Sequence, residues 1–449
     1  MAKKEIKALL RDIEPFETQA AGRRTGPGHR MIPRAARFVI VGAGVHGLST
    51  AAHLAEEVGG GDAVLVLDKS RAGAGASGIS GGIVRNFYLS APMNEIVRRS
   101  VEIFELDPQL FGFRQVGYVA VVPEAQAQEL ERIAAQHAEI GYASTLVTGA
   151  RRVGDHLRGL FPDWRARGAT AALHEERSGW ADAGTTVAAL AGLARAAGVR
   201  LAEGVEVVGF AGDGGGAVTA VETTAGSIAC DVVVLAPGPW ARDLWRLLDL
   251  PLEVDVAGEA APLFHYWQVR EGDYAHAAAA LDPASPVVHL DADEPASEHL
   301  PVPWGIYFRP GLAGGVAAGG LPLPLDLECE LDPYGPSHPV DGRTSEAFDL
   351  GLEDALSWAL ERFAGAGWTG SSYACPTLFT PDSYPVVGFV RENVYAVLDS
   401  NHGFKMLALG RLAARELAGG QAPELDPFRL ERFARAALHP ASSSPYPWT

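Results

Sequence analysis

The chain has 449 residues, more than one hydrophobic core usually supports, so we expect two interleaved domains. Its formal net charge of −18 argues against nucleic acid and anionic membranes as partners, and no apolar run reaches the roughly 18 residues of a membrane helix. The three cysteines, Cys230, Cys329 and Cys375, fit neither a disulfide framework nor a zinc site. We therefore expect a water-soluble, cytoplasmic protein without a metal site.

Residues 1–36 form a basic extension. Lysines and arginines outnumber acidic residues in this stretch, which lacks the apolar core and cleavage site of a secretory signal. We expect the extension to pack on the acidic body of the protein, and a flexible tail is the alternative.

A strand, a glycine turn, a helix and a second strand follow the extension. RFVIVGAG predicts a buried strand ending in glycines, VHGLSTAAHLAEEV has apolar residues at helical spacing, and AVLVLDKS predicts the second strand. This order is typical of the βαβ opening of a Rossmann-like parallel sheet.

The glycine turn predicts a dinucleotide site. Gly42 makes the tight turn, Gly44 lets the backbone approach a pyrophosphate, and Gly47 lets the helix pack on the strand. Asp68 lies 21 residues after Gly47, where an acid binds ribose hydroxyls and disfavours NADP relative to NAD or FAD. The alternative is that the glycines only build a turn and Asp68 caps a strand.

The rest of the chain predicts a second domain interleaved with the first. Residues 92–140 have a mainly helical pattern with a strand at 116–122, residues 205–235 are rich in strands, and Pro and Gly separate short strands from 250 to 340. The expected class is α/β (α+β overall), with a Rossmann-like domain and a substrate domain on a mixed or antiparallel sheet. The expected boundaries are 1–36 for the extension, 37–90, 175–249 and 366–435 for the dinucleotide-binding domain, 91–174 and 250–365 for the substrate-binding domain, and 436–449 for a C-terminal tail.

Four later segments resemble one family of enzymes. They are GASGISGGIVRNFY (Gly75 to Tyr88), GVEVVGF (Gly204 to Phe210), DVVVLAPGPWARDL (Asp231 to Leu244) and SNHGFKM (Ser400 to Met406). With the glycine turn, they are similar to the D-amino-acid oxidase superfamily of FAD enzymes, and most closely to its branch of monomeric sarcosine oxidase and related N-methyl amino acid oxidases. The likeness extends from Arg37 to about Gly420.

The resemblance implies that the Rossmann-like domain binds FAD. A glycine-rich loop can run close to a planar ring, and a helix N-terminus stabilises the negative charge that hydride transfer leaves on the flavin. The resemblance implies these FAD-binding residues: Gly42, Gly44, Val45, His46, Gly47, Asp68, Lys69, Ser77, Gly78, Gly81, Gly82, Val207, Gly238, Trp240, Asp382, His402, Gly403, Phe404 and Lys405.

Arg85 and Lys405 are the expected substrate residues. In the sarcosine oxidase branch, the residues that match them hold the substrate carboxylate. Arginine offers a carboxylate two parallel donors, and lysine adds a compact positive charge. The alternatives are a surface ion pair for Arg85 and a solvated lysine at the start of a helix for Lys405.

Cys375 is a candidate for covalent attachment of FAD. It lies seven residues before Asp382, a spacing at which the resembling enzymes carry a cysteine bonded to the flavin 8α-methyl group. A thiolate is the nucleophile that such a bond requires. An unreactive buried cysteine is the alternative.

The sequence departs from the family pattern at several positions. Ala317 aligns with the oxygen-activating lysine of sarcosine oxidase, so reoxidation by O2 or by another acceptor, such as a quinone or an electron-transfer protein, stays open. Gly82 replaces a second arginine, and Leu398 and Asp399 replace small and apolar residues, which suggests a larger N-substituted substrate. For His265, Tyr266 and His402, a structural role is expected over a pocket role.

The predicted function is FAD-dependent oxidation of the C–N bond of an amino acid or N-substituted amino acid, of the sarcosine oxidase or glycine oxidase kind. Hydride leaves the α-carbon or an N-alkyl carbon, and water hydrolyses the resulting imine. The alternatives are a flavin dehydrogenase of a hydroxy acid or polyol phosphate and a non-catalytic flavoprotein subunit.

Overall fold

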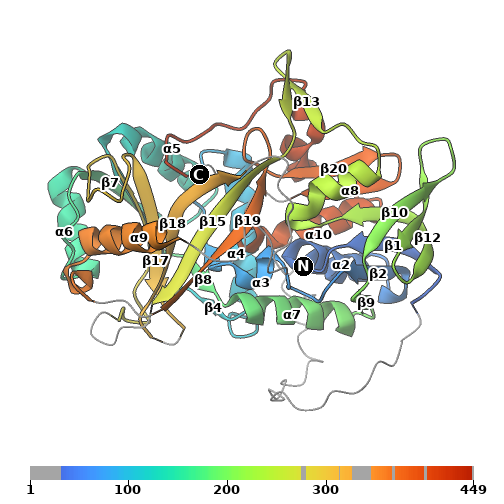
Figure 1. Ribbon diagram of the computed structural model, residues 1–449, viewed down its shortest axis with the longest axis horizontal. Coiled ribbons are helices and arrows are strands. Elements are labelled where there is room, and N and C mark those ends of the chain that lie inside the picture. The colour runs from blue at the N-terminus through green and yellow to red at the C-terminus, as the bar shows by residue number, and fades with distance from the viewer. Residues whose placement is uncertain are drawn as a thin grey trace.

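The computed structural model describes residues 32–274, 280–312, 314–325, 345–366, 370–398 and 402–446, with backbone only at 370–373 and 375. Two large sheets lie side by side in it (Figure 1). The expected basic extension falls almost entirely outside these residues. No described helix is both long and apolar enough to cross a membrane.

The first sheet begins with the expected βαβ unit. Its central strands run parallel, and Phe38 to Val41 on β1 are buried because both faces of the sheet are covered. Its described strands, in spatial order, are β10 (Val207–Gly212), β11 (Val218–Thr223), β12 (Gly226–Leu235), β1 (Ala35–Val41), β2 (Val64–Asp68) and β9 (Arg200–Glu203). On the β12 side, β21 (Val394–Leu398) pairs with β12, and β20 (Val386–Arg391) pairs with β21.

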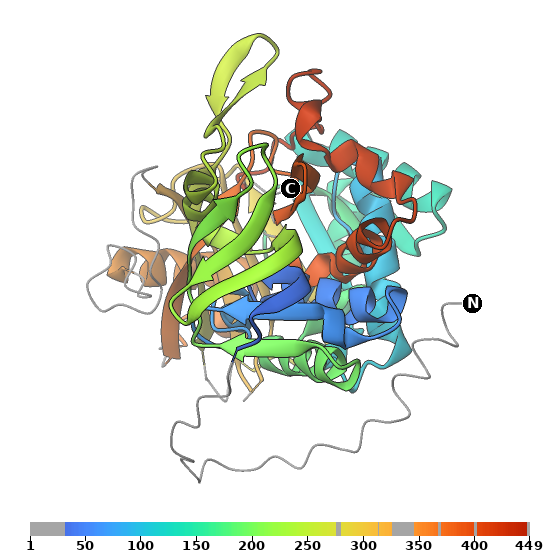
Figure 2. The same ribbon diagram turned by 90° about the vertical axis from the view of Figure 1, so that its right-hand side faces the viewer.

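Helices cover the first sheet and form a shared core with it. Helices α2, α7, α10 and α4 pack against one another, and α8 packs near β10 (Figure 2). Their bounds are α2 (Val45–Glu57), α4 (Ala91–Leu106), α7 (Ala183–Ala196), α8 (Ala241–Leu247) and α10 (Leu407–Leu417).

The second sheet is mainly antiparallel, with one parallel pair, β16 and β5. In spatial order it contains β19 (Gly370–Phe379), β15 (His265–Tyr274), β18 (Val316–Leu325), β17 (Trp304–Pro310), β16 (Val287–Ala292), β5 (Tyr118–Pro123), β7 (Ala169–Glu175) and β6 (Ser144–Thr148). Helix α9 (Glu346–Ala359) packs on β17 and β18, while α5 (Ala127–Glu139) and α6 (Ala150–Leu160) pack on β6 and β7.

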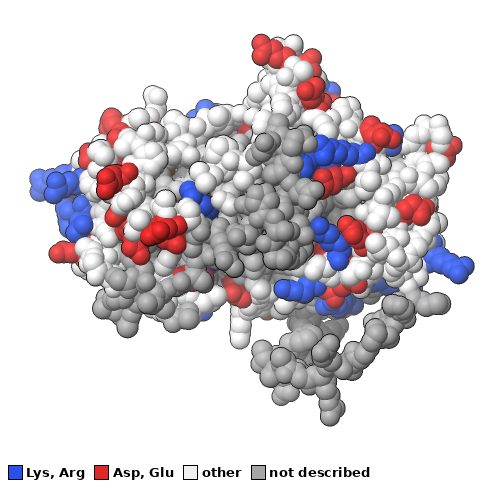
Figure 3. Space-filling model, viewed as in Figure 1, with Lys and Arg blue, Asp and Glu red and all other residues white. Residues whose placement is uncertain are grey.

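Short elements complete the described fold. Strand β8 (Gly179–Ala181) pairs with β3 (Ile83–Val84) and with β4 (Phe113–Arg114), and the hairpin of β13 (Glu253–Val256) and β14 (Glu259–Pro262) projects from the body (Figure 2). Acidic and basic side chains are interspersed over the described part of the face in Figure 3.

The predicted fold class, a Rossmann-like domain with an interleaved second sheet, is confirmed. The strand pairing differs from the expected boundaries in two places. Strand β1 already begins at Ala35, and β19 pairs along its length with β15, so it belongs to the second sheet although residues from 366 onward were expected in the first domain. A strand belongs to the sheet that contains the strand it bonds to, and the local sequence of β19 does not specify that partner.

The expected C-terminal tail packs on the body as far as Tyr446. Arg432 donates two hydrogen bonds of 2.8 Å to the buried Asp382, and the ring of His439 packs 4.4 Å from that of Tyr384. Although burial opposes ionisation, the paired Arg432 lowers the pKa of Asp382. Tyr446 is itself 2% exposed and lies 5.0 Å from the ring of His289 in the second sheet. The end of the chain therefore joins the two sheets.

Breaking the Asp382–Arg432 pair should destabilise the protein strongly. Arg432→Met leaves a buried carboxylate without its cation, and we expect a loss of about 3–5 kcal/mol in the free energy of unfolding. The double variant Asp382→Leu, Arg432→Met should recover part of this loss because neither charge remains. Urea unfolding of the three proteins measures both effects, and a double variant less stable than Arg432→Met contradicts the explanation.

Candidate active site

The glycine turn after β1 has the close packing that the sequence predicts. Gly42 has φ +108°, and a Cβ there would clash with the carbonyl oxygen of Ala236. A Cβ on Gly47 would clash with the carbonyl oxygen of Gly42, so this glycine lets α2 pack on the turn. A Cβ on Gly44 would lie 2.9 Å from Oγ of Ser77, which accepts a hydrogen bond from N–H of Val45. Gly44 therefore places no side chain at the start of α2, where a phosphate can bind.

Asp68 ends β2 and binds the backbone of the same turn. Its Oδ2 accepts a 2.9 Å hydrogen bond from N–H of Ala43, and its Oδ1 accepts one of 2.8 Å from N–H of Ser70. Burial raises the pKa of Asp68. The next residue, Lys69, holds its ammonium 4.4 Å from the ring of Trp240.

A cavity of about 540 Å³ opens at the carboxyl ends of β1 and β2. In a parallel sheet this edge is where dinucleotides bind. Gly42 and Gly44 bring no side chains to its lining, so the backbone at the start of α2 borders the cavity, which fits a pyrophosphate. The residues expected at FAD that line it are Gly42, Gly44, Val45, His46, Asp68, Lys69, Ser77, Val207, Gly238 and Trp240.

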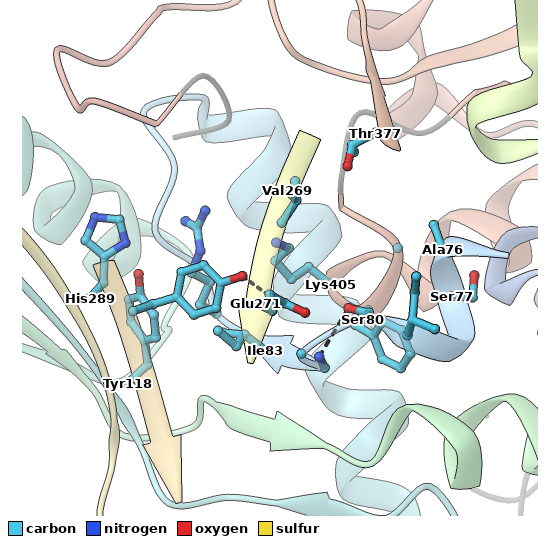
Figure 4. Close-up of a pocket in the computed structure, with 17 residues that line it drawn as sticks. Ala76, Ser77, Ser80, Ile83, Tyr118, Val269, Glu271, His289, Thr377 and Lys405 are labelled. Atoms are coloured by element: carbon cyan, nitrogen blue, oxygen red, sulfur yellow. Dashed lines mark hydrogen bonds between the residues drawn. The ribbon is translucent and has the colours of Figure 1, made fainter. Parts of the chain in front are cut away.

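A second, smaller pocket of about 100 Å³ continues from this cavity. Ala76, Ser77 and Thr377 line both. Arg85 and Lys405, far apart in the sequence, line the same pocket, and Figure 4 shows Lys405 among the side chains of its wall. Gly81, Gly82, Gly403 and Phe404 also line it.

The loop that bears Gly81 and Gly82 has little freedom. Gly82 has φ +66°, and a Cβ there would clash with the carbonyl oxygen of Ala181. The carbonyl oxygen of Gly81 accepts a 2.9 Å hydrogen bond from Nε of Arg309. This packing and the positive φ favour a glycine at position 82.

Arg85 and Lys405 are buried, at 4% and 8% exposed. Arg85 donates a 2.6 Å hydrogen bond from Nη1 to the carbonyl oxygen of Phe87, and its guanidinium lies 4.7 Å from the ring of Tyr88. Lys405 lies in a short turn (Gly403–Lys405) just before α10. A surface ion pair for Arg85 and a solvated lysine at position 405 are therefore excluded.

Glu175 fixes the segment after Arg85. Its Oε2 accepts hydrogen bonds of 2.7 Å from N–H of Asn86 and 2.5 Å from Oγ of Ser178. Burial raises the pKa of Glu175 to about 7, although these hydrogen bonds and the charge of Arg85 act in the opposite direction.

The sequence analysis missed several pocket residues, among them four with ionisable side chains: Tyr118, Glu271, His289 and Tyr307. All four lie on strands of the second sheet. The only sequence signal is a polar residue at an alternate position of an apolar strand, and that signal carries no information about which strands are neighbours.

The comparison with protein families decides the assignment. The model of the family described as "FAD dependent oxidoreductase" matches residues 37–416. The chain belongs to this family.

Individual relatives are similar over most or part of the chain. The 4-methylaminobutanoate oxidase (formaldehyde-forming) of Paenarthrobacter nicotinovorans is 26% identical over 82% of this chain and 41% of its own length. The glycine oxidase of Pseudomonas putida is 31% identical over 49% of this chain and 60% of its own length. The chain thus spans less than two thirds of these relatives. The solved L-proline dehydrogenase of P. horikoshii, at 20% identity, has the same fold, with a TM-score of 0.74 over 91% of this chain and 100% of that one.

Some residues expected at FAD do not line either cavity. Asp382 is engaged by Arg432, and His402, 1% exposed, packs 5.1 Å from the ring of Tyr88. A Cβ on Gly78 would clash with the carbonyl oxygen of Gly73, which gives this glycine a packing role. His265, Tyr266 and Ala317 also lie away from the lining, and the hydroxyl of Tyr266 donates to the carbonyl oxygen of Pro239.

Two expectations fall outside the described part of the chain. Asp399 is not among the described residues, and only the backbone of Cys375 is described. Among the described residues, no cluster of three or more His, Cys, Asp or Glu could hold a metal ion.

Glu175 should give the stability of this flavoprotein a distinct pH dependence. Because its folded-state pKa, about 7, exceeds the ordinary value of 4.5 for a glutamate, its stabilising contribution is complete below about pH 4.5 and is lost as the pH rises through 7. Glu175→Gln should remove this slope, which is on the order of 3 kcal/mol. Urea unfolding at pH 5 and pH 8 measures it, with the exposed neighbour variant Glu176→Gln as control. Parallel pH profiles of Glu175→Gln and the unmodified protein contradict the prediction.

Proposed function

We propose that this protein oxidises the C–N bond of an amino acid or N-substituted amino acid. The observation that carries the proposal is the shared pocket of Arg85 and Lys405, which adjoins the dinucleotide cavity through Ala76, Ser77 and Thr377. Relatives named as oxidases of glycine and of 4-methylaminobutanoate support it.

FAD, when bound, supplies the hydride acceptor. Arg85 offers parallel N–H donors to the substrate carboxylate, and Lys405 adds a second positive charge from the opposite end of the chain. Because both side chains are buried, their attraction for a carboxylate is less screened than in water. Held by its carboxylate, the substrate keeps one orientation, as hydride transfer requires. Water then hydrolyses the released imine.

Reduction of the flavin without oxygen tests this proposal directly. Sarcosine, glycine, proline, N-methylated amino acids and 4-methylaminobutanoate are mixed anaerobically with the holoprotein, and loss of the visible flavin absorbance is recorded. Matched hydroxy acids and glycerol phosphate are the comparison. Bleaching by at least one amine and by none of the hydroxy compounds supports the proposal, and the reverse pattern, or no bleaching by any amine, overturns it.

The electron acceptor is a finer point of the same proposal. We infer an acceptor other than O2, because Ala317 supplies no cation and its neighbour Arg309 is bonded to the carbonyl oxygen of Gly81. The two cations that line the pocket, Arg85 and Lys405, are assigned to the substrate carboxylate. The rate of flavin reoxidation is measured after the reduced protein is mixed with O2 or with a soluble quinone. Faster reoxidation by O2 contradicts this inference.

Removing the charge of Arg85 should affect only substrates with a carboxylate. Arg85→Gln should lower kcat/KM for an amino acid about 10- to 100-fold. For the corresponding amine, in which a hydrogen replaces the carboxylate, kcat/KM should change little. Arg114→Gln, at an exposed arginine 5.0 Å from the ring of Trp180, is the control. Equal losses for both substrates would mean that Arg85 shapes the fold rather than the binding of the carboxylate.

Cys375 is proposed to bond covalently to the flavin. Its backbone pairs with Val269, which lines the smaller pocket, and Thr377 two residues on lines both cavities. Acid precipitation should therefore give a yellow pellet, and Cys375→Ser a white pellet with a yellow supernatant. Cys230→Ser is the control, because burial raises the pKa of that thiol to about 11 and leaves it unreactive. A white pellet from the unmodified protein rules the bond out.

A further inference from the structure

A row of side chains crosses the second sheet at the pocket. Glu271 on β15 pairs with Gly319 on β18, Gly319 pairs with Tyr307 on β17, and Tyr307 pairs with His289 on β16. Directly paired residues project from the same face of a sheet. Glu271, Tyr307 and His289 all line the smaller pocket, so this row forms one of its walls.

Gly319 makes room for its two neighbours. A Cβ at this position would lie 2.5 Å from the hydroxyl of Tyr307 and 2.8 Å from Cγ of Glu271. The two longer side chains therefore meet above the glycine, where the hydroxyl of Tyr307 donates a hydrogen bond to Oε1 of Glu271. The carboxylate is thus held in one place.

The carboxylate of Glu271 lies against the glycine loop of the first domain. A Cβ on Gly81 would lie 2.6 Å from Oε1 and 3.5 Å from Oε2, so both oxygens border this glycine. Glu271 is only 9% exposed, and it is the one acidic residue among the described residues that line the pocket. A fixed negative charge therefore stands in the pocket that contains Arg85 and Lys405.

We propose that Glu271 binds the positively charged nitrogen of the substrate. This inference rests on the proposed function, in which Arg85 and Lys405 hold the carboxylate of the same molecule. A carboxylate that lines the pocket attracts a cation and repels a second carboxylate. The substrate class is then the zwitterion, in which an ammonium or alkylammonium group lies one or a few carbons from a carboxylate. Before hydride leaves, the nitrogen gives one proton to Glu271, because a nitrogen without a lone pair cannot form the imine.

Glu271 could have a different role at the same position in the pocket. Glu271 could act solely as a counter-ion that compensates the two cations, without touching the substrate. The two roles differ in one measurable respect. A counter-ion affects every carboxylate ligand equally, whereas a nitrogen-binding group affects only ligands with a charged nitrogen.

Ligand pairs of equal shape separate these roles. N-Methylglycine and butanoate differ only in NH2⁺ against CH2, and proline and cyclopentanecarboxylate form a larger pair of the same kind. Their dissociation constants are measured by calorimetry on the holoprotein, whose flavin is first reduced with dithionite under anaerobic conditions so that no ligand is consumed. The unmodified protein should prefer the nitrogen member at least 10-fold in one pair, and Glu271→Gln should reduce this preference about 10- to 100-fold.

Two control variants complete the experiment. Asp273→Asn removes the same charge two residues along β15, at an exposed position outside the pocket lining, and should keep the preference. Tyr307→Phe removes the hydrogen bond to Glu271 and should weaken the preference partly. Flavin content and thermal midpoint show that each variant is folded.

The outcomes distinguish this inference from the proposed function. Equal changes for both members of a pair in Glu271→Gln, or no preference in the unmodified protein, overturn the role of Glu271. Amino acids that still bleach the flavin in that case leave the proposed function intact. If no amine bleaches the flavin and neither pair binds, both fail together.

Discussion

The loop between α3 (Ala76–Ile79) and α4 is the constraint on which the pocket depends. Gly82 lies against the backbone of Ala181, Arg309 of the second sheet holds the carbonyl oxygen of Gly81, and Glu175 holds N–H of Asn86. These contacts come from the small sheet that contains β8 and from the second large sheet, so the position of Arg85, within the same loop, depends on both. The site is therefore a product of the tertiary fold rather than of any one motif.

The local sequence pattern was sufficient to predict the dinucleotide cavity. Gly47 packs on Gly42 and Asp68 bonds to the backbone of the same turn, all within one βαβ unit, although Gly42 itself packs against the distant Ala236. Arg85 and Lys405 were found in a different way, through a resemblance that carries long-range information. Periodicity alone gives no reason for these two cations to meet in one pocket, as they do here.

Strand register explains what the sequence did not reveal. Glu271, Tyr307 and His289 become one wall only because β15, β18, β17 and β16 pair at particular residues, and a single strand pattern does not specify its partner. The same limit explains β19, whose partner is β15 of the second sheet. Asp382 was expected at FAD from the family resemblance, but its oxygens bind Arg432 from near the end of the described chain.

Charge balance connects the pocket to the ligand it favours. Two buried cations are costly unless negative charge lies near them. Glu175 contributes from behind Arg85, and burial leaves its pKa at about 7, so its charge is only partial near neutral pH. Glu271 contributes from the pocket wall. A zwitterion adds one positive and one negative charge and so leaves the net charge of the pocket unchanged, whereas a simple amine or a simple carboxylate changes it by one. The composition of the wall thus favours ligands that carry both charges.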